Sequence, residues 1–310
     1  MFKIALMFPG QGTQFVGMGK EFYDKYSKAR EIIDLTGKEL KQIIFEGPEE
    51  ILKSTKYAQP AIFAVSIAAF EVFKELFDIS NVEFVAAGHS LGEYSALCAA
   101  GFFGFEEGFA MVKARGEFIQ KASEDNPGLM AAIIGVDKFI VESVCKKASI
   151  FGVCEVANLN SPEQIVIAGT KEAIDKAVMF AKEYGAKRTV ILNVSGPFHS
   201  SLMASASDNM SKELEKYNFN VPNFGVYTNC DALLTTSSSF VKEKLVKQIK
   251  NSVKWDESIR SIIKSGFDKF IEIGPGRVLS GLLKRIDSSK KALNIENMIS
   301  LQKTLEELNK

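Results

Sequence analysis

Apolar runs of two different lengths alternate along this chain, and the alternation limits the possible folds more than any other feature of the sequence. Runs of strand length occur at residues 3–8, 82–88 and 269–274, whereas apolar residues at helical spacing fill residues 59–77 and 91–101. Strands and helices that follow one another in this order are typical of an α/β protein built on a sheet. We therefore expect an α/β fold.

The predicted elements in the middle of the chain are shorter and follow a different order. From residue 128 to residue 194 they run strand, helix, strand, strand, helix, strand, which is the βαββαβ order of a ferredoxin-like subdomain. Turn residues in ASEDNPG and NVSGPF indicate its entry and its exit. We predict that a small subdomain at 125–195 is inserted between two parts of a large domain, at 1–124 and 196–310.

Composition limits the location and the partners of the protein. No apolar run approaches the ~18 residues of a membrane helix, and the first one stops at Pro9, too early for a signal peptide. Lysine plus arginine equals aspartate plus glutamate at 38 each, so the net charge gives no sign of a nucleic-acid partner. We expect a cytoplasmic monomer with no nucleic-acid or membrane partner.

Cysteine and histidine numbers argue against a metal site. The four cysteines include no C-x-x-C pair, and the chain has only two histidines. These residues cannot supply a cage of the usual cysteine and histidine ligands, so we expect no metal.

A serine with glycines on both sides lies between a predicted strand and a predicted helix. The stretch from Gly88 to Gly92, GHSLG, fits the G-x-S-x-G pattern of a nucleophile elbow. Glycines at both flanks permit a sharp turn, from which the hydroxyl of Ser90 projects and the backbone N–H of Leu91 can bind an oxyanion. A chance match to a short pattern is the alternative, but the strand before it and the helix after it favour a catalytic serine.

Serine needs a base within hydrogen-bonding distance, and the chain offers two histidines. Neighbours on a sharp turn point in different directions, so we interpret His89 as a support of the elbow. His199, in the loop after the inserted subdomain, is the better candidate. An α/β-hydrolase would have an acid between serine and histidine, but Asp137 and Asp175 fall in helices of the small subdomain. A lipase or esterase therefore fits poorly, and a neutral carbonyl is the alternative partner of the imidazole.

Two further segments offer groups for a substrate. The glycine-rich loop FPGQGTQFVGMG lacks the Gly-Lys-Ser/Thr of a phosphate loop, but its glycines allow the backbone N–H of Gln11 to approach a reacting carbonyl. A plain connecting turn is the alternative. Arg115 interrupts an apolar helix face, where its guanidinium could bind a substrate carboxylate, unless it is simply an exposed helix residue.

A set of motifs resembles one known family over nearly the whole chain. They are FPGQGTQFVGMG, GHSLGEYSAL, the helix of Arg115, NLNSPEQIVIAG, SGPFHSSLM, NSVKW and EIGPGRVLSGLL. In this order they resemble the malonyl-CoA:acyl carrier protein transacylases of type II fatty-acid synthesis. The resemblance implies an α/β-hydrolase-like large domain with a ferredoxin-like insertion.

The resemblance also implies a role for each matching residue. Ser90 corresponds to the nucleophile and His199 to the base, with the carbonyl of Gln248 orienting the imidazole. The remaining matches are Gln11 and Leu91 as oxyanion donors, Arg115 as the partner of the malonyl carboxylate, and Phe198 as a wall of the acyl pocket. Because Phe198 is bulky, we expect malonyl to be preferred over methylmalonyl.

The implied activity is that of an [acyl-carrier-protein] S-malonyltransferase that works by a ping-pong mechanism through a malonyl-serine ester. Malonyl-CoA is then a substrate, acyl carrier protein is the partner, and no cofactor is expected. An acyltransferase of a polyketide pathway, a serine thioesterase or esterase, and a non-catalytic module that binds the carrier protein remain alternatives. The absence of fused synthase sequence from these 310 residues favours a stand-alone enzyme.

Overall fold

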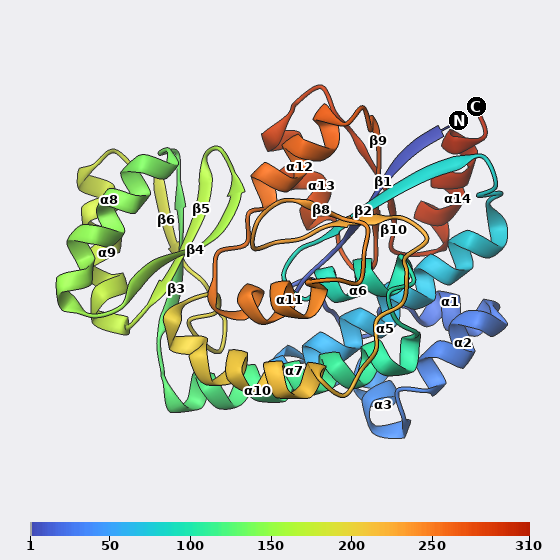
Figure 1. Cartoon of the computed structure of the whole chain (residues 1–310), viewed down its shortest axis with the longest axis horizontal. Helices are drawn as coiled ribbons and strands as arrows, with labels where there is room; N and C mark the ends of the chain where they lie inside the picture. Colours follow the sequence, from blue (N-terminus) through green and yellow to red (C-terminus); the bar gives the residue numbers. More distant parts are fainter. Residues whose placement is uncertain (1) are drawn as a thin grey trace.

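The computed structural model describes residues 2–310 and contains two sheets (Figure 1). The larger sheet has the order β10-β9-β1-β2-β7-β8. Its strands are β1 (Phe2–Phe8), β2 (Val82–Gly88), β7 (Gly225–Tyr227), β8 (Leu234–Thr235), β9 (Lys269–Ile273) and β10 (Ala292–Ile295). All neighbouring pairs are parallel except β7 and β8. The predicted α/β fold is confirmed, whereas β8 was not predicted, because a strand of two residues carries no periodic signal.

Helices cover both faces of this sheet because side chains alternate along its strands. Ile4, Leu6 and Phe8 of β1 belong to the core on one face, whereas Ala5 and Met7 belong to the core on the other. The first face is covered by α5 (Thr55–Leu76), α6 (Gly92–Ala99) and α7 (Phe105–Asp125), and the second by α12 (Trp255–Lys264) and α13 (Val278–Ile286).

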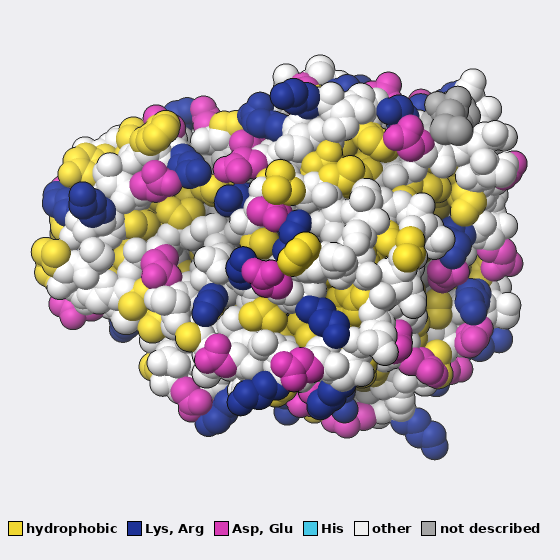
Figure 2. Space-filling view, viewed as in Figure 1, with side chains coloured by type: hydrophobic (Ala, Val, Ile, Leu, Met, Phe, Trp, Pro, Cys, Tyr) yellow, Lys and Arg dark blue, Asp and Glu magenta, His cyan; other side chains and the backbone are white. Residues whose placement is uncertain are grey.

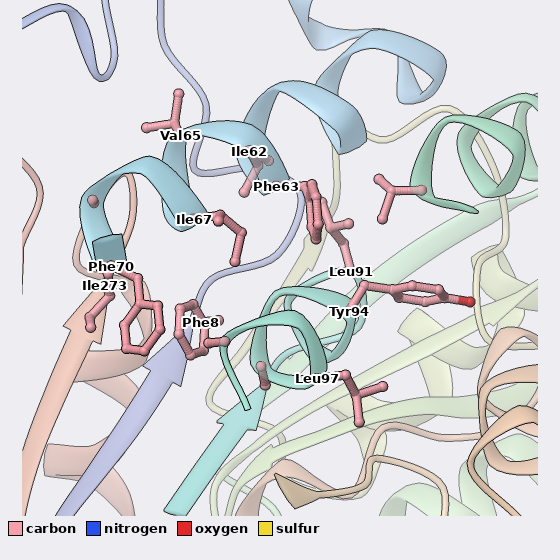
Figure 3. Packing of buried hydrophobic residues seen from close by; sticks show 14 of the residues in the cluster. Phe8, Ile62, Phe63, Val65, Ile67, Phe70, Leu91, Tyr94, Leu97 and Ile273 are labelled. Atoms are coloured by element: carbon pink, nitrogen blue, oxygen red, sulfur yellow. The ribbon is translucent and has the colours of Figure 1, made fainter. Parts of the chain in front are cut away.

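The core between β1 and α5 holds the carboxyl end of β1 in place. Figure 3 shows the ring of Phe8 beside that of Phe70, at a centroid distance of 6.1 Å with the rings edge to face. Leu91 and Tyr94, at the start of α6, belong to the same buried cluster. The segment that carries Ser90 is therefore fixed from below by apolar packing.

Smaller helices complete the large part of the chain. Residues 20–53 form four short helices: α1 (Lys20–Lys25), α2 (Ser27–Asp34), α3 (Lys38–Glu46) and α4 (Glu49–Lys53). Later in the chain lie α10 (Ala204–Leu214), α11 (Val241–Lys250) and α14 (Met298–Leu308). Within residues 2–310, no helix combines the length and the apolar character needed to cross a membrane.

The second sheet is antiparallel and has the order β4-β5-β3-β6. Its elements follow the predicted order: β3 (Leu129–Ile134), α8 (Lys138–Ala148), β4 (Cys154–Ser161), β5 (Gln164–Gly169), α9 (Lys171–Glu183) and β6 (Arg188–Ile191). Helices α8 and α9 pack on one face. The other face carries a smaller apolar cluster that includes Met130, Ala132 and Val166.

Backbone hydrogen bonds join the edge of the small sheet to the large part of the chain. The N–H of Leu159 in β4 donates to the carbonyl oxygen of Val253 at 2.9 Å, and the N–H of Val253 donates to that of Ala157 at 2.9 Å. This pairing fixes the uncovered face of the small sheet opposite the carboxyl ends of β1 and β2.

Candidate active site

Ser90 occupies the turn between the end of β2 and the start of α6. Its φ of 52° lies in the left-handed region, which residues other than glycine seldom adopt. The flanking glycines are required by close packing: a Cβ on Gly88 would lie 1.8 Å from the carbonyl oxygen of Gly92, and a Cβ on Gly92 would lie 2.0 Å from that of Phe8. The predicted elbow is therefore a sharp turn that only glycine can flank.

His199 lies next to this serine, although the two are 109 positions apart in the sequence. The Nε2 of His199 is 2.8 Å from the Oγ of Ser90, and its ring is buried. Its φ of 58° is also left-handed, so both members of the pair have a strained backbone. The other histidine, His89, has its Nε2 2.8 Å from the Oδ1 of Asn160, in keeping with a supporting role.

A backbone carbonyl orients the imidazole of His199. The carbonyl oxygen of Gln248 lies 2.8 Å from Nδ1, so Nδ1 carries the proton and Nε2 is left to accept from the serine hydroxyl. Burial lowers the pKa of His199 to about 3, and the positive charge of Arg115 acts in the same direction. The imidazole is therefore neutral at neutral pH and able to accept a proton.

Arg115 is buried in α7 and faces the serine, so the alternative of an exposed helix residue is wrong. Its Nη2 donates to the Oγ of Ser90 at 3.1 Å and to the Oε1 of Gln248 at 2.9 Å. Its Nη1 donates to the Oε1 of Gln59 at 2.6 Å. All three acceptors are uncharged, so the guanidinium remains an attractive partner for an anionic group that enters the site.

The first loop lies beside the elbow because β1 and β2 are parallel and in register. Phe8 pairs with Gly88, and the N–H of His89 donates to the carbonyl oxygen of Phe8 at 3.0 Å. Gln11 and Leu91 both line the cavity above Ser90. Across residues 2–310, neither of their backbone N–H groups donates a hydrogen bond to another protein group. The two N–H groups are thus unoccupied donors in the wall of the site.

A cavity of about 280 Å³ opens above the serine, between the two sheets. Ser90, His199 and Arg115 belong to its lining, together with the first loop and the start of α13. The uncovered face of the small sheet supplies an apolar wall of Met130, Ala132 and Val166, and Phe198 continues this wall next to the histidine. Such a site suits an acyl group with one charged end.

Sequence reasoning missed several polar residues that hold these groups. Asn229 follows β7 at the carboxyl edge of a parallel sheet, where ligand-binding and catalytic sites are usually found. Its position was therefore a usable signal of a site residue. Gln59 is a buried polar residue within the apolar helix α5, and a polar residue in such a helix was a second usable signal. Glu93 lies one helical turn after Ser90 and is fully buried, but a glutamate in the first turn of a helix carries no such signal.

Comparisons with known proteins agree with this arrangement. The family model described as "Acyl transferase domain" matches residues 5–307. The malonyl CoA-acyl carrier protein transacylase of Bacillus subtilis is 42% identical, over 99% of this chain and 98% of the relative.

Solved structures give the same result. An acyl-carrier-protein-S-malonyltransferase from Bartonella henselae superposes with a TM-score of 0.94 at 39% identity, and the match covers 100% of both chains. A malonyl-transacylase solved in complex with a type II PKS acyl-carrier protein has a TM-score of 0.94 and 38% identity, over 98% of this chain and 99% of that one. The chain belongs to the family of malonyl CoA-acyl carrier protein transacylases.

Proposed function

We propose that this protein transfers a malonyl group from malonyl-CoA to the phosphopantetheine thiol of an acyl carrier protein, for fatty-acid biosynthesis. One structural observation supports the proposal in addition to membership of the family. The buried guanidinium of Arg115 lies 3.1 Å from the Oγ of Ser90, which itself lies 2.8 Å from the base His199. A nucleophile with a cation this close suits an acyl group that ends in a carboxylate.

The first half of the reaction loads the enzyme. The Oγ of Ser90 attacks the thioester carbonyl as its proton passes to the Nε2 of His199. The backbone N–H groups of Gln11 and Leu91 stabilise the oxyanion that forms. The C–S bond then breaks, the sulfur of coenzyme A takes the proton from His199, and the malonyl group remains as an ester on Ser90.

The second half transfers the malonyl group to the carrier. The pantetheine thiol gives its proton to His199 and attacks the ester carbonyl, and the same two N–H groups stabilise the oxyanion. The C–O bond breaks and Ser90 regains its proton. The carbonyl of Gln248 keeps Nδ1 protonated throughout, a task for which a neutral acceptor is sufficient.

Two residues select the acyl group. Arg115 binds the malonyl carboxylate, exchanging its contact with the Ser90 hydroxyl for a charge-assisted bond. Phe198 lines the cavity together with His199, so we expect an additional methyl on the α-carbon to meet its ring. Malonyl is therefore accepted in preference to methylmalonyl.

The finer description of the fold belongs to the same proposal. We assign residues 1–124 and 196–310 to an α/β-hydrolase-like domain and residues 125–195 to a ferredoxin-like insertion. The βαββαβ order and the sheet order β4-β5-β3-β6 support the insertion, and the elbow after a parallel strand supports the larger domain. We also propose a cytoplasmic monomer that uses no metal or cofactor and binds neither nucleic acid nor membrane.

The carrier protein has to bind near the cavity, and no single strongly charged region stands out on the face seen in Figure 2. Basic and acidic side chains are interspersed on this face. We therefore assign no docking residues and leave the choice of carrier to experiment.

Intact mass spectrometry tests the proposed reaction. Wild-type protein and Ser90→Ala are incubated separately with malonyl-CoA and acetyl-CoA, and carrier proteins from fatty-acid and polyketide pathways are then added. We expect a malonyl adduct on the wild type only, and its transfer to the fatty-acid carrier. Release of free acid without carrier loading would indicate a thioesterase, transfer only to the polyketide carrier would indicate that pathway, and no adduct at all would exclude an acyltransferase.

A further inference from the structure

A second charged side chain is buried beneath the site, and the reaction above does not use it. Glu93 lies in the first turn of α6 and is fully buried. Its Oε2 accepts hydrogen bonds from the Nε2 of Gln248 at 2.8 Å and from the backbone N–H of Asn229 at 3.1 Å. Its other oxygen, Oε1, has no hydrogen-bond partner in the described part of the chain.

The amide of Gln248 lies between this carboxylate and Arg115. Its Nε2 donates to Glu93, and its Oε1 accepts from Arg115 at 2.9 Å. Among the ion pairs found in residues 2–310, none joins Glu93 and Arg115 directly. The two buried charges thus balance each other through one amide, and the guanidinium stays free to bind an incoming anion.

Other ionisable groups near Glu93 do not supply this balance. Tyr94, on the same helix, and Cys230, from the loop after β7, both have a pKa raised by burial and remain neutral. Asp231 of the same loop is ionised, but it pairs with Lys244 at 3.0 Å. His199 is neutral, as described above. The buried centre of the site therefore contains two side chains that can be charged near neutral pH, the positive Arg115 and the negative Glu93.

We propose that Glu93 is the buried counter-charge of Arg115 and that it takes up a proton when an acyl group bearing a carboxylate binds to Arg115. This inference rests on the proposed function. An ionised malonyl group adds a second negative charge to a buried centre that holds a single positive one. Burying an unbalanced charge costs far more free energy than taking a proton from solvent near neutral pH.

The geometry of Glu93 accommodates that proton. Both donors contact Oε2, so a proton on the unpartnered Oε1 leaves the bonds from Gln248 and Asn229 intact. The net charge of the centre changes while the positions of its groups stay the same. Glu93 therefore acts as a positioning and charge-balancing residue and does not touch the reacting atoms.

The protonation equilibrium of Glu93 is suited to this role. Burial raises the pKa of Glu93 to about 7, against the opposing effects of its hydrogen bonds and of the positive charge of Arg115. A malonyl carboxylate on Arg115 cancels part of that positive charge and raises the pKa further. Malonyl-CoA should consequently bind most tightly below pH 7, and its affinity should fall by up to about tenfold per pH unit above it.

Proton uptake can be measured directly by isothermal titration calorimetry. Ser90→Ala is titrated with malonyl-CoA and with acetyl-CoA at pH 7.5, in buffers that differ in ionisation enthalpy. The two ligands share coenzyme A, so the difference between them reports the carboxylate alone. We expect malonyl-CoA to take up about half a proton more than acetyl-CoA, and we expect the double variant with Glu93→Gln to abolish this difference.

A kinetic measurement gives a second test. In the wild type, the KM for malonyl-CoA should rise above pH 7 while that for acetyl-CoA stays flat. Glu93→Gln retains an oxygen that can accept both hydrogen bonds, so its KM for malonyl-CoA should be low and independent of pH. Ser95→Ala removes a buried hydroxyl of the same helix that has no hydrogen-bond partner among residues 2–310, so it is the matched control and should follow the wild type.

The outcomes separate this inference from the proposed function. If wild-type protein forms no malonyl-Ser90 adduct, the proposed function fails and the inference fails with it. If the adduct forms but proton uptake is equal for the two ligands, or its difference persists in Glu93→Gln, only the inference is overturned. Labelling of Ser90 by the neutral reagent phenylmethylsulfonyl fluoride, at an equal rate in all variants with an intact serine, verifies that the elbow is folded.

Discussion

The side-chain oxygen of Asn229 accepts a hydrogen bond from the backbone N–H of Ser90 at 2.7 Å. The amide nitrogen of the same side chain donates to the carbonyl oxygen of Gly88, also at 2.7 Å. One buried amide thus spans the turn on both sides of the serine. Because Ser90 has an unfavourable φ, these bonds stabilise a backbone conformation that the local sequence alone does not favour.

Replacing this amide should damage both stability and reactivity. Asn229→Leu leaves two buried backbone groups without partners, so we expect the free energy of unfolding to fall by about 2–4 kcal/mol. Acylation of Ser90 by malonyl-CoA should slow at least about tenfold, since the hydroxyl loses its fixed position. Chemical denaturation and stopped-flow acylation measure the two effects. Asn294 in β10 has a side-chain amide nitrogen with no partner in the described part of the chain, so Asn294→Leu should change neither.

Arg115→Met tests the selection of a charged acyl group. Loss of a charge-assisted bond worth about 1.5–3 kcal/mol should lower kcat/KM for malonyl-CoA about 10²-fold and that for acetyl-CoA much less. Lys113→Met, an exposed change on the same helix, should leave the ratio of the two values unaltered. An equal loss for both substrates would argue that Arg115 serves the serine and not the carboxylate.

The low pKa of His199 predicts an unusual pH profile. The ring becomes protonated only near pH 3, whereas an ordinary histidine is protonated below about 6.5. Labelling of Ser90 by phenylmethylsulfonyl fluoride should therefore stay nearly constant between pH 8 and pH 5. This reagent carries no charge, so Glu93 should not affect the result. A decline with a midpoint near pH 6.5 would contradict the prediction.

Phe198→Ala should widen the acyl pocket beside the histidine. We expect methylmalonyl-CoA to acylate the variant faster than the wild type, while malonyl-CoA loses rate through poorer packing. Competition between the two acyl-CoAs, followed by intact mass, gives the ratio directly. Wild-type protein that accepts both groups at the same rate would remove the case for Phe198 as a selective wall.

Glu93 should make stability depend on pH in a defined direction. Its pKa is raised in the folded protein from an ordinary 4.5 to about 7. The contribution of Glu93 to the free energy of unfolding is therefore fully present below pH 4.5 and is lost as pH rises through 7. Compared with the wild type, Glu93→Gln should gain about 3 kcal/mol of unfolding free energy between pH 4.5 and pH 8. Urea denaturation at several pH values measures this, and a difference that does not vary with pH would refute it.

The sequence predicted those parts of the site that depend on residue type and local order. Ser90 has a strand before it and a helix after it, and His199 was the one histidine free to approach it. The acceptor of the imidazole proton is a backbone carbonyl, which every residue possesses, so no pattern of residue types could single out Gln248. Only the resemblance to a family supplied it.

Tertiary structure decided the remainder. Asn229 and Glu93 act through contacts with residues 136 or more positions away, and such contacts leave no periodic signal. The four helices of residues 20–53 were not predicted, because each spans only 5 to 9 residues and the periodic signal of so short a helix is weak.

The two walls of the cavity come from different sheets, and this affects how such enzymes can change their choice of acyl group. The proposed nucleophile, base and oxyanion donors lie on the large sheet and its loops, whereas Met130, Ala132 and Val166 come from the uncovered face of the small sheet. Mutations in that second wall can reshape the room for the acyl chain without disturbing the serine or its base. An evolving enzyme could thereby come to accept a different acyl group through changes in the small sheet alone, while the serine and its base stay the same.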